Sequence, residues 1–316
     1  MIAFGPVPSR RLGQSLGINN IPPKICTYSC AYCQVGRTQN LQVNRESFYK
    51  HNKIVKSVEK QINEAQKRGE RINYLAFVPD GEPSLDCYLG KEIELLKSFG
   101  IKIAVITNAT LLWRQDVRED LLRADWVSVK IDAVSPGIWQ KVNRPHKTLH
   151  LDNILENIHK FSQYFEGVLT TETMLINDLN DKTDECEKIA CFISEINPHK
   201  SYLSIPTRPP ADKRIKPPSE HSINMAYQIF SAQGINVEYL LGYEGNTFAY
   251  TGNIEKDLLS ITSVHPMRKE GVNELLKKSH ADWSLMTHLI NEKKLVEVEY
   301  QGEKFYLRNL PNRLPK

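Results

Sequence analysis

The sequence predicts an α/β fold built on a parallel sheet, either open or curled into a full or partial (β/α) barrel, followed by a small domain. Short apolar segments alternate along the chain with amphipathic segments of helical period. The apolar segments are nearly continuous, which is typical of parallel strands covered by helices. The handedness of β-α-β connections then leaves the open sheet or the barrel. A different pattern after about residue 256 predicts the small domain.

The predicted elements follow one another closely in the first domain, residues 1–255. We expect a short strand at 15–19, a helix at 47–69 that ends at Gly69, and a buried strand at 73–79. The remaining strands and helices alternate, with strands at 101–107, 126–132, 168–176, 201–206 and 235–240 and helices at 91–100, 114–124, 151–165, 184–196 and 219–233. In such folds the active site lies at the carboxyl ends of the strands.

The second predicted domain, residues 256–316, has a winged-helix pattern. Helices are expected at 265–279 and 281–294, and a hairpin at 295–300 and 303–309 around a Gln-Gly turn. Winged helices bind nucleic acids or dock proteins, so RNA and a protein partner are both possible ligands. The basic residues of this segment stand beside acidic ones, which dilutes phosphate attraction; they are His288, Lys293, Lys294, Lys304 and Arg308 beside Glu297, Glu299 and Glu303.

The composition is that of an ordinary globular protein, with 41% apolar and 25% charged residues among 316. No apolar run reaches the roughly 18 residues of a membrane span, and no signal peptide is evident. We therefore expect a cytoplasmic protein without a membrane partner, in a compartment where thiols stay reduced. Residues 1–50 hold six Lys/Arg and one acid, a basic region that could face an anionic substrate.

Three of the six cysteines, Cys26, Cys30 and Cys33, fall within eight residues as C-x3-C-x2-C. A structural zinc site needs four ligands, and only the distant His51 is a candidate for the fourth. Three thiolates on a four-iron cluster would instead leave one iron open for a small molecule, such as the amino and carboxylate groups of S-adenosylmethionine. The other cysteines, which are expected to be plain thiols, are Cys87, Cys186 and Cys191.

The cysteine motif, with Tyr32 just before its last cysteine, resembles that of the radical SAM superfamily. The resemblance implies a partial (β/α)6 barrel whose three cysteines hold a [4Fe-4S] cluster. It also implies that the reduced cluster cleaves S-adenosylmethionine to a 5′-deoxyadenosyl radical, which removes hydrogen from a substrate. An electron donor of the flavodoxin or ferredoxin type would supply the electron. Zinc binding or unrelated thiols remain the alternative.

The strand at 73–79 ends in DGEPSL, which is similar to the family's Gly-Gly-Glu-Pro motif. Gly81, Glu82 and Pro83 match, and the resemblance implies that they bind the amino group of the methionine moiety. Asp80 replaces the usual first glycine. A glycine allows close approach of backbone to ligand, although an ordinary turn would show the same residues.

Polar residues at later strand ends are further candidates. Asn108 follows the strand at 101–107, and its amide could reach the cofactor or cap a turn. Ser128, Lys130 and Asp132 alternate to one side of their strand, where they could form a structural network or hold ribose, carboxylate or substrate.

Two arginines are the remaining candidates for substrate binding. Arg144 and Arg208 each precede a proline and suit bidentate contacts to an anion at the substrate mouth. The nearby cations, for which an ordinary surface role is favoured, are Lys213, Arg214 and Lys216.

Several further segments are similar to radical SAM proteins grouped with the wyosine-base synthases, which modify tRNA. They are GPVPSRRLG, CAYCQVGRT, DGEPSL, NRPH and TGNIEKDLLSITSVHPMR. Wyosine synthases carry additional cysteines for a second cluster, and this chain has none before Cys26, so the pyruvate condensation of that branch is not expected. The expected substrate is a nucleic-acid base, in tRNA. A peptide or protein substrate is the alternative, and a non-enzymatic metal-sensing regulator that binds duplex DNA is the third hypothesis.

Overall fold

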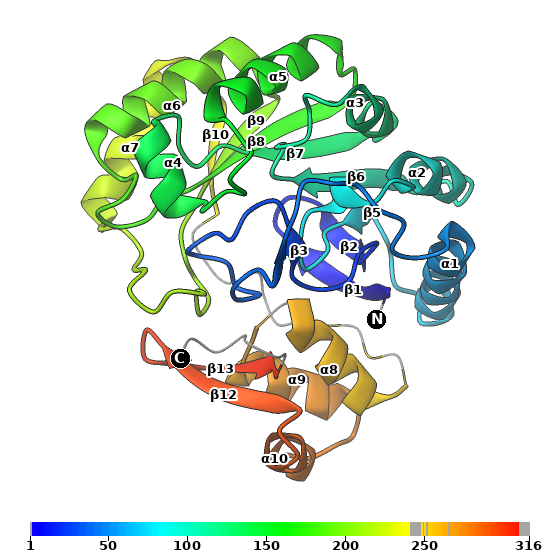
Figure 1. The fold of residues 1–316 in the computed structure, drawn as a ribbon. Coiled ribbons are helices and arrows are strands. Elements are labelled where there is room, and N and C mark those ends of the chain that lie inside the picture. Colours follow the sequence, from blue (N-terminus) through cyan, green and yellow to red (C-terminus); the bar gives the residue numbers. More distant parts are fainter. Residues whose placement is uncertain (1, 241–247, 249, 251, 265, 310–316) are drawn as a thin grey trace.

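A curled eight-stranded sheet forms the centre of the molecule (Figure 1). The computed structural model describes residues 2–240, 248, 250, 252–264 and 266–309. The sheet has the order β1-β2-β5-β6-β7-β8-β9-β10. Its strands are β1 Ala3–Ser9, β2 Gly13–Ile18, β5 Tyr74–Phe77, β6 Lys102–Thr107, β7 Trp126–Lys130, β8 Val168–Met174, β9 Lys200–Ser204 and β10 Val237–Leu240. Since β1 and β10 are its edges, the structure confirms a partial barrel and excludes the open-sheet and closed-barrel alternatives.

The strands from β2 to β10 pair in parallel, as the sequence predicts, but β1 pairs with β2 in the antiparallel sense and was not expected. Pro6 and Pro8 interrupt the segment and argue against a strand, because proline cannot donate to a ladder. At a sheet edge this cost disappears. The strand is therefore possible only because the fold places it at the edge.

Helices cover the outer, convex face of the sheet (Figure 1). They are α1 His51–Lys67, α2 Leu89–Lys97, α3 Gln115–Leu121, α4 Pro136–Val142, α5 Leu151–Tyr164, α6 Thr183–Ile196 and α7 Glu220–Ala232. In α1 the buried face contains Ile54, Val58 and Ile62, as its period predicts. Each such side chain contributes about 1.5–3 kcal/mol when it is fully buried. The short helix α4 was not predicted.

The concave face is filled at one end by apolar side chains and is polar at the other. Trp126, Tyr202 and Leu240 pack with Leu12, Ala76 and Ala104 in one cluster. The carboxyl ends of the strands lie beyond this apolar cluster, and there backbone groups and polar side chains face a common space. The chain thereby leaves a cavity at the end of the barrel where the sequence places its motifs.

A C-terminal unit, formed by the described residues between 252 and 309, has a core of its own. Its elements are α8 Ile254–Val264, β11 Met267–Arg268, α9 Lys269–Lys278, α10 Ser284–Asn291, β12 Leu295–Tyr300 and β13 Glu303–Arg308. The hairpin of β12 and β13 confirms the one predicted, and β11 adds a third strand beside β13. The helix expected at 265–279 begins later, at Lys269, since residues 267–268 form β11. His265 and residues 310–316 lie outside the described residues.

Three shorter elements lie outside the main sheet. β3 Ile25–Cys26 pairs with β4 Asn40–Leu41 across the loop that carries the cysteines, and η1 Pro83–Leu85 is a single 3-10 turn after β5. Among the described residues, every helix is too short or too polar to cross a bilayer.

Candidate functional site

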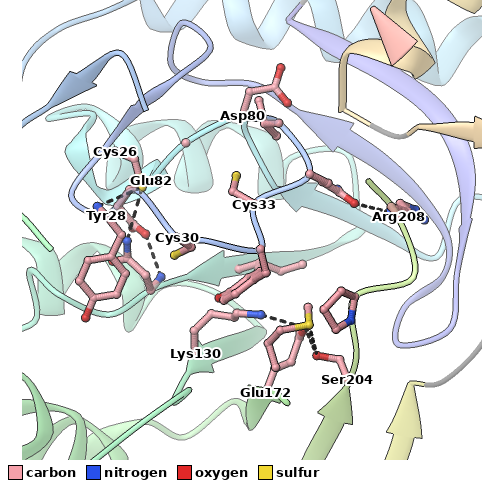
Figure 2. A pocket seen from close by; sticks show the side chains of 18 of the residues that line it. Cys26, Tyr28, Cys30, Cys33, Asp80, Glu82, Lys130, Glu172, Ser204 and Arg208 are labelled. Atoms are coloured by element: carbon pink, nitrogen blue, oxygen red, sulfur yellow. Dashed lines mark hydrogen bonds and ion pairs between the residues drawn. The ribbon is translucent and has the colours of Figure 1, made fainter. Parts of the chain in front are cut away.

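A cavity of about 300 Å³ lies at the carboxyl ends of β5 to β9. Its wall contains all three clustered cysteines, Gly81 and Glu82, and the side chains of Asn108 and Lys130. Figure 2 shows the cysteines with Lys130, Glu172 and Ser204 below them in the view and Arg208 to one side. Residues from distant parts of the sequence thus meet at one point.

The cysteine loop, residues 22–38, is held on two sides by backbone hydrogen bonds. On one side Lys24 N donates to Asp80 O (2.6 Å) and Glu82 N donates to Ile25 O (3.1 Å). On the other side Ala31 N donates to the carbonyl of Val142 at the end of α4 (2.8 Å). These contacts fix the loop against the ends of β5 and α4.

The three thiols are half-buried, and their surroundings favour the neutral form. Burial, together with the charges of Asp132 and Cys33, raises the pKa of the Cys30 thiol to about 12, although hydrogen bonds from Asn143 and Tyr32 oppose this shift. Burial likewise raises the pKa of the Cys26 thiol, with Glu82 adding to it. Bound iron would displace these protons, because thiolates are the metal ligands.

The three thiols fit an iron–sulfur cluster by the chemistry of their donor atoms. No three Cys, His, Asp or Glu side chains converge to hold one metal ion in the part of the chain that the structure describes. An iron–sulfur cluster takes each cysteine on a different iron, so three separated thiols lining one cavity match it.

Position 81 requires a glycine for a structural reason that differs from the predicted one. A Cβ atom at this position would lie 1.9 Å from the carbonyl oxygen of Ile25. The glycine therefore allows the strand end to approach the cysteine loop, and this contact alone excludes a larger residue. Close approach to a ligand, the reason given by the sequence, is not needed to explain it.

Glu82 is buried and its carboxylate is held by four donors. Oε1 accepts from Ser84 N (3.0 Å), Ser84 Oγ (2.6 Å) and Thr107 Oγ1 (2.6 Å), and Oε2 accepts from Asn108 N (2.8 Å). Burial raises the pKa of Glu82, and these hydrogen bonds lower it in part. The carboxylate is thus fixed in orientation at the cavity wall. The next residue, Pro83, begins η1 and lies behind the wall.

Asn108 directs its amide toward the cysteine loop. Its Nδ2 donates to Thr27 Oγ1 (2.7 Å) and lies 3.6 Å from Cys26 Sγ. The following residue, Ala109, has a φ of 61°, a left-handed conformation that costs an alanine about 1 kcal/mol relative to glycine. A glycine at this position, as in the family pattern, would relieve that strain.

A buried ion network forms the floor of the cavity. Lys130 Nζ and Ser204 Oγ donate to Glu172 Oε1 at 2.9 and 3.0 Å, and Arg11 Nη1 donates to Glu172 Oε2. Burial raises the pKa of Glu172, but Arg11 and Lys130 outweigh it and hold that pKa at about 2. Lys130 Nζ also lies 5.2 Å above the ring of Tyr32.

Of these residues, the sequence predicted only Lys130 and Tyr32 as site residues. Glu172, Ser204 and Arg11 were missed. The signal for Glu172 was present as a single acid inside the strand VLTTETM, because a buried carboxylate requires cationic partners.

Asp132 and Ser128 lie deeper than predicted. Asp132 accepts hydrogen bonds from Tyr32 Oη, from Asn143 Nδ2 (2.7 Å) and from Met174 N (2.9 Å). Ser128 is fully buried, and its Oγ has no hydrogen-bond partner among the described residues. Both are outside the cavity lining, and of the two only Asp132 belongs to a hydrogen-bond network among the described residues.

The two arginines that the sequence predicts to bind substrate, Arg144 and Arg208, lie in different places. Arg208 lines the cavity, and its Nη1 donates to Gln34 Oε1 (2.8 Å). Arg144 Nη2 donates to Asp212 Oδ2 (2.6 Å) outside the cavity lining, and Arg214 binds the same carboxylate. The hydrogen bonds from Arg214 and, second, from Arg144 hold the pKa of Asp212 below its usual range.

The comparisons with known proteins agree with this geometry. The family model of the radical SAM superfamily matches residues 20–189, more than half of the chain. The UPF0026 protein MJ1312 of Methanocaldococcus jannaschii is 50% identical over 314 residues, which are 99% of this chain and 97% of that protein. An S-adenosylmethionine-dependent nucleotide dehydratase of Lacinutrix mariniflava is 28% identical over 123 residues, 38% of this chain and 25% of that protein.

Among solved structures, the fold is similar to that of a radical SAM methyltransferase from Sphaerobacter thermophilus. The TM-score is 0.56 at 17% identity, and the match covers 72% of this chain and 66% of that one. At this identity the likeness concerns the fold alone.

Proposed function

The chain belongs to the radical SAM superfamily, and on this basis we propose that Cys26, Cys30 and Cys33 hold its [4Fe-4S] cluster. It is therefore an enzyme that uses this cluster and S-adenosylmethionine. One observation carries the assignment: these three thiols come from one loop and line one cavity at the strand ends. The remaining cysteines lie elsewhere, with Cys186 buried and Cys87 and Cys191 exposed.

We assign the binding of S-adenosylmethionine to the ends of β5 and β6. Gly81, Glu82 and Asn108 line the cavity beside the cysteines. The carboxylate of Glu82 is held in place by its donors, so it offers a fixed negative charge for an ammonium group. When bound, the cluster would supply the electron for reductive cleavage of S-adenosylmethionine, and Gly81, Glu82 and Asn108 would hold that cofactor beside it.

The chain's own residues would bind and orient the substrate. The charged floor of the cavity is the network of Arg11, Lys130 and Glu172. An apolar part of its wall, which would exclude water, is formed by Val35, Ile106 and Ile205. Exclusion of water protects a reactive radical from side reactions.

We propose that the substrate is a nucleic-acid base, in tRNA. The support is the charge of the cavity, whose lining holds Arg10, Arg11, Lys24, Lys130 and Arg208 against the acids Asp80, Glu82 and Glu172. An excess of cationic side chains attracts phosphate groups. The C-terminal unit adds a surface beside the mouth, and the name of one relative, a nucleotide dehydratase, points to the same class of compound.

Anaerobic reconstitution tests the cluster and the cofactor. We expect about four irons per chain and formation of 5′-deoxyadenosine when S-adenosylmethionine and dithionite are added. Cys30→Ala should abolish both, and the matched control Cys191→Ala, at an exposed position on α6, should retain both. Well-folded wild-type protein with neither property would refute the assignment.

A second experiment tests the substrate. We expect unfractionated tRNA to be retained by the protein, with retention falling as salt rises, and one nucleoside to change mass after incubation with the reduced enzyme. A protein bound in place of RNA, with tRNA nucleosides unchanged, would support the peptide or protein alternative and reject tRNA.

A further inference from the structure

Two asparagine side chains connect the cysteine loop to the barrel through sulfur. Asn108 Nδ2 lies 3.6 Å from Cys26 Sγ and 2.7 Å from Thr27 Oγ1. Asn143 Nδ2 lies 3.6 Å from Cys30 Sγ and 2.7 Å from Asp132 Oδ2. An amide nitrogen carries two hydrogens, so each can serve both of its acceptors.

The surroundings fix how these amides point. Asn108 Oδ1 accepts from Thr110 N (3.2 Å) and Thr110 Oγ1 (2.8 Å), so the nitrogen must face Thr27 and Cys26. Its orientation therefore follows from the hydrogen-bond network.

Asn143 is 2% exposed and is anchored by its own backbone at the end of α4. Its N–H donates to Trp139 O (2.8 Å), and its carbonyl accepts from Ser29 N (3.1 Å) in the cysteine loop. The carboxylate of Asp132 attracts the amide hydrogens, so the nitrogen faces Asp132 and Cys30. The amide thus stands between a buried carboxylate and a cysteine.

We propose that Asn143, with Asn108 beside the neighbouring thiol, is a positioning residue that raises the reduction potential of the cluster. This inference rests on the proposed assignment of the cluster to Cys26, Cys30 and Cys33. Reduction adds negative charge to the cluster and its thiolates, and an N–H donor stabilises that charge. Asn143 has a second effect, because it shields Cys30 from the nearby carboxylate of Asp132, whose charge opposes reduction.

The test is a redox titration of reconstituted full-length protein followed by electron paramagnetic resonance, without substrate. Asn143→Leu removes both donors while keeping the number and branching of the side-chain heavy atoms, and we expect its midpoint potential to shift to a more negative value. Asn143→Asp, which has the same shape and adds a charge, should shift it further in the same direction. It also provides the readout if the leucine variant fails to assemble a cluster.

Asn180→Leu is the matched control. Asn180 is also fully buried, and its amide donates to the carbonyls of Asp132 (2.7 Å) and Met174 (2.8 Å), away from the three clustered cysteines. We expect this variant to melt at a lower temperature while its cluster keeps the wild-type potential. A residue with only a structural role would behave like Asn180.

The outcomes separate the two proposals. If wild-type protein assembles no cluster, the proposed function fails. If wild-type protein assembles a cluster but both Asn143 variants keep its potential, or shift it to a more positive value, the proposed function stands and the role of Asn143 is rejected.

Discussion

At the scale of single residues, the cysteine loop and the end of β5 depend on each other. Gly81 is needed because its missing side chain leaves room for the carbonyl of Ile25. Asp80 and Glu82, on either side of it, form backbone hydrogen bonds with the loop. The motif therefore positions the thiols as well as lining the cofactor cavity.

Gly81→Ala should displace the cysteine loop. The added methyl group would overlap Ile25 O, and the resulting strain should lower the free energy of unfolding by at least about 2 kcal/mol. We also expect less than half of the wild-type iron content after reconstitution, measured by iron analysis together with urea denaturation.

Gly137→Ala is the control for that experiment. Nothing lies within 4 Å of the position a Cβ would take, and the residue is in the first turn of α4. Its stability should be unchanged or slightly higher. Equal iron content in Gly81→Ala and wild-type protein would contradict the steric argument.

At the scale of an element, α2 carries a buried acid that the site does not use. Glu92 is fully buried beside Asp86, and its carboxylate oxygens have no donor among the described residues. Both groups accept hydrogen bonds when ionised, so they can bond only if one holds a proton. Burial and, next to it, the charge of Asp86 together raise the pKa of Glu92 to about 9.

Glu92→Gln should prevent the fall in the free energy of unfolding that we expect of the wild-type protein at high pH. In the folded protein the pKa of Glu92 lies above its ordinary value of 4.5. The stability that the neutral carboxyl contributes is therefore complete below pH 4.5 and is lost as pH rises from there toward 9. The glutamine amide can donate to Asp86 at every pH. We expect the variant to exceed wild type by about 1–3 kcal/mol at pH 9 and by little at pH 5 in urea denaturation.

Glu94→Gln is the matched control on the same helix. Glu94 is exposed and forms surface ion pairs with Lys97 and Arg123, each at 3.5 Å. Such pairs contribute about 0–1 kcal/mol, so this variant should follow the wild-type pH profile. Parallel profiles for Glu92→Gln and wild type would show that Glu92 is ionised in the folded protein.

At the scale of the whole molecule, the C-terminal unit lies against the barrel (Figure 1). Tyr300, at the end of β12, donates its hydroxyl to Pro206 O (3.0 Å), and Pro206 lines the cavity. Lys278 pairs with Glu70 at 3.5 Å, and Val7 of β1 packs against the core of the unit. The hairpin therefore holds the proline-rich loop after β9.

Tyr300→Phe should loosen that loop without unfolding the barrel. Loss of one hydrogen bond costs about 0.5–1.5 kcal/mol. We expect faster amide hydrogen exchange in residues 205–218 and unchanged exchange in β5 to β8, measured by mass spectrometry. Tyr164→Phe, at a tyrosine that is 71% exposed, should leave both regions unchanged. Unchanged exchange in the loop of the Tyr300 variant would mean that the hairpin does not restrain it.

The sequence by itself determined the alternation of most strands and helices, a parallel sheet that is open or curled, and the meeting of the cysteine loop with the ends of β5 and β6. These follow from local periodicity and from the rule that parallel strands share one carboxyl edge. Even the hairpin of β12 and β13 was readable, because its turn and its strands are adjacent in sequence.

Only the tertiary structure decided which polar residues face the cavity. Ser128, Lys130 and Asp132 share one side of a strand in the sequence, yet of the three only Lys130 lines the cavity, while Ser128 is fully buried and Asp132 is engaged by partners from other elements. Arg144 and Arg208 look alike in sequence and separate because Asp212 binds the first. The edge strand β1 and the amides of Asn108 and Asn143 near sulfur likewise depend on partners far along the chain, and local patterns carry no record of such contacts.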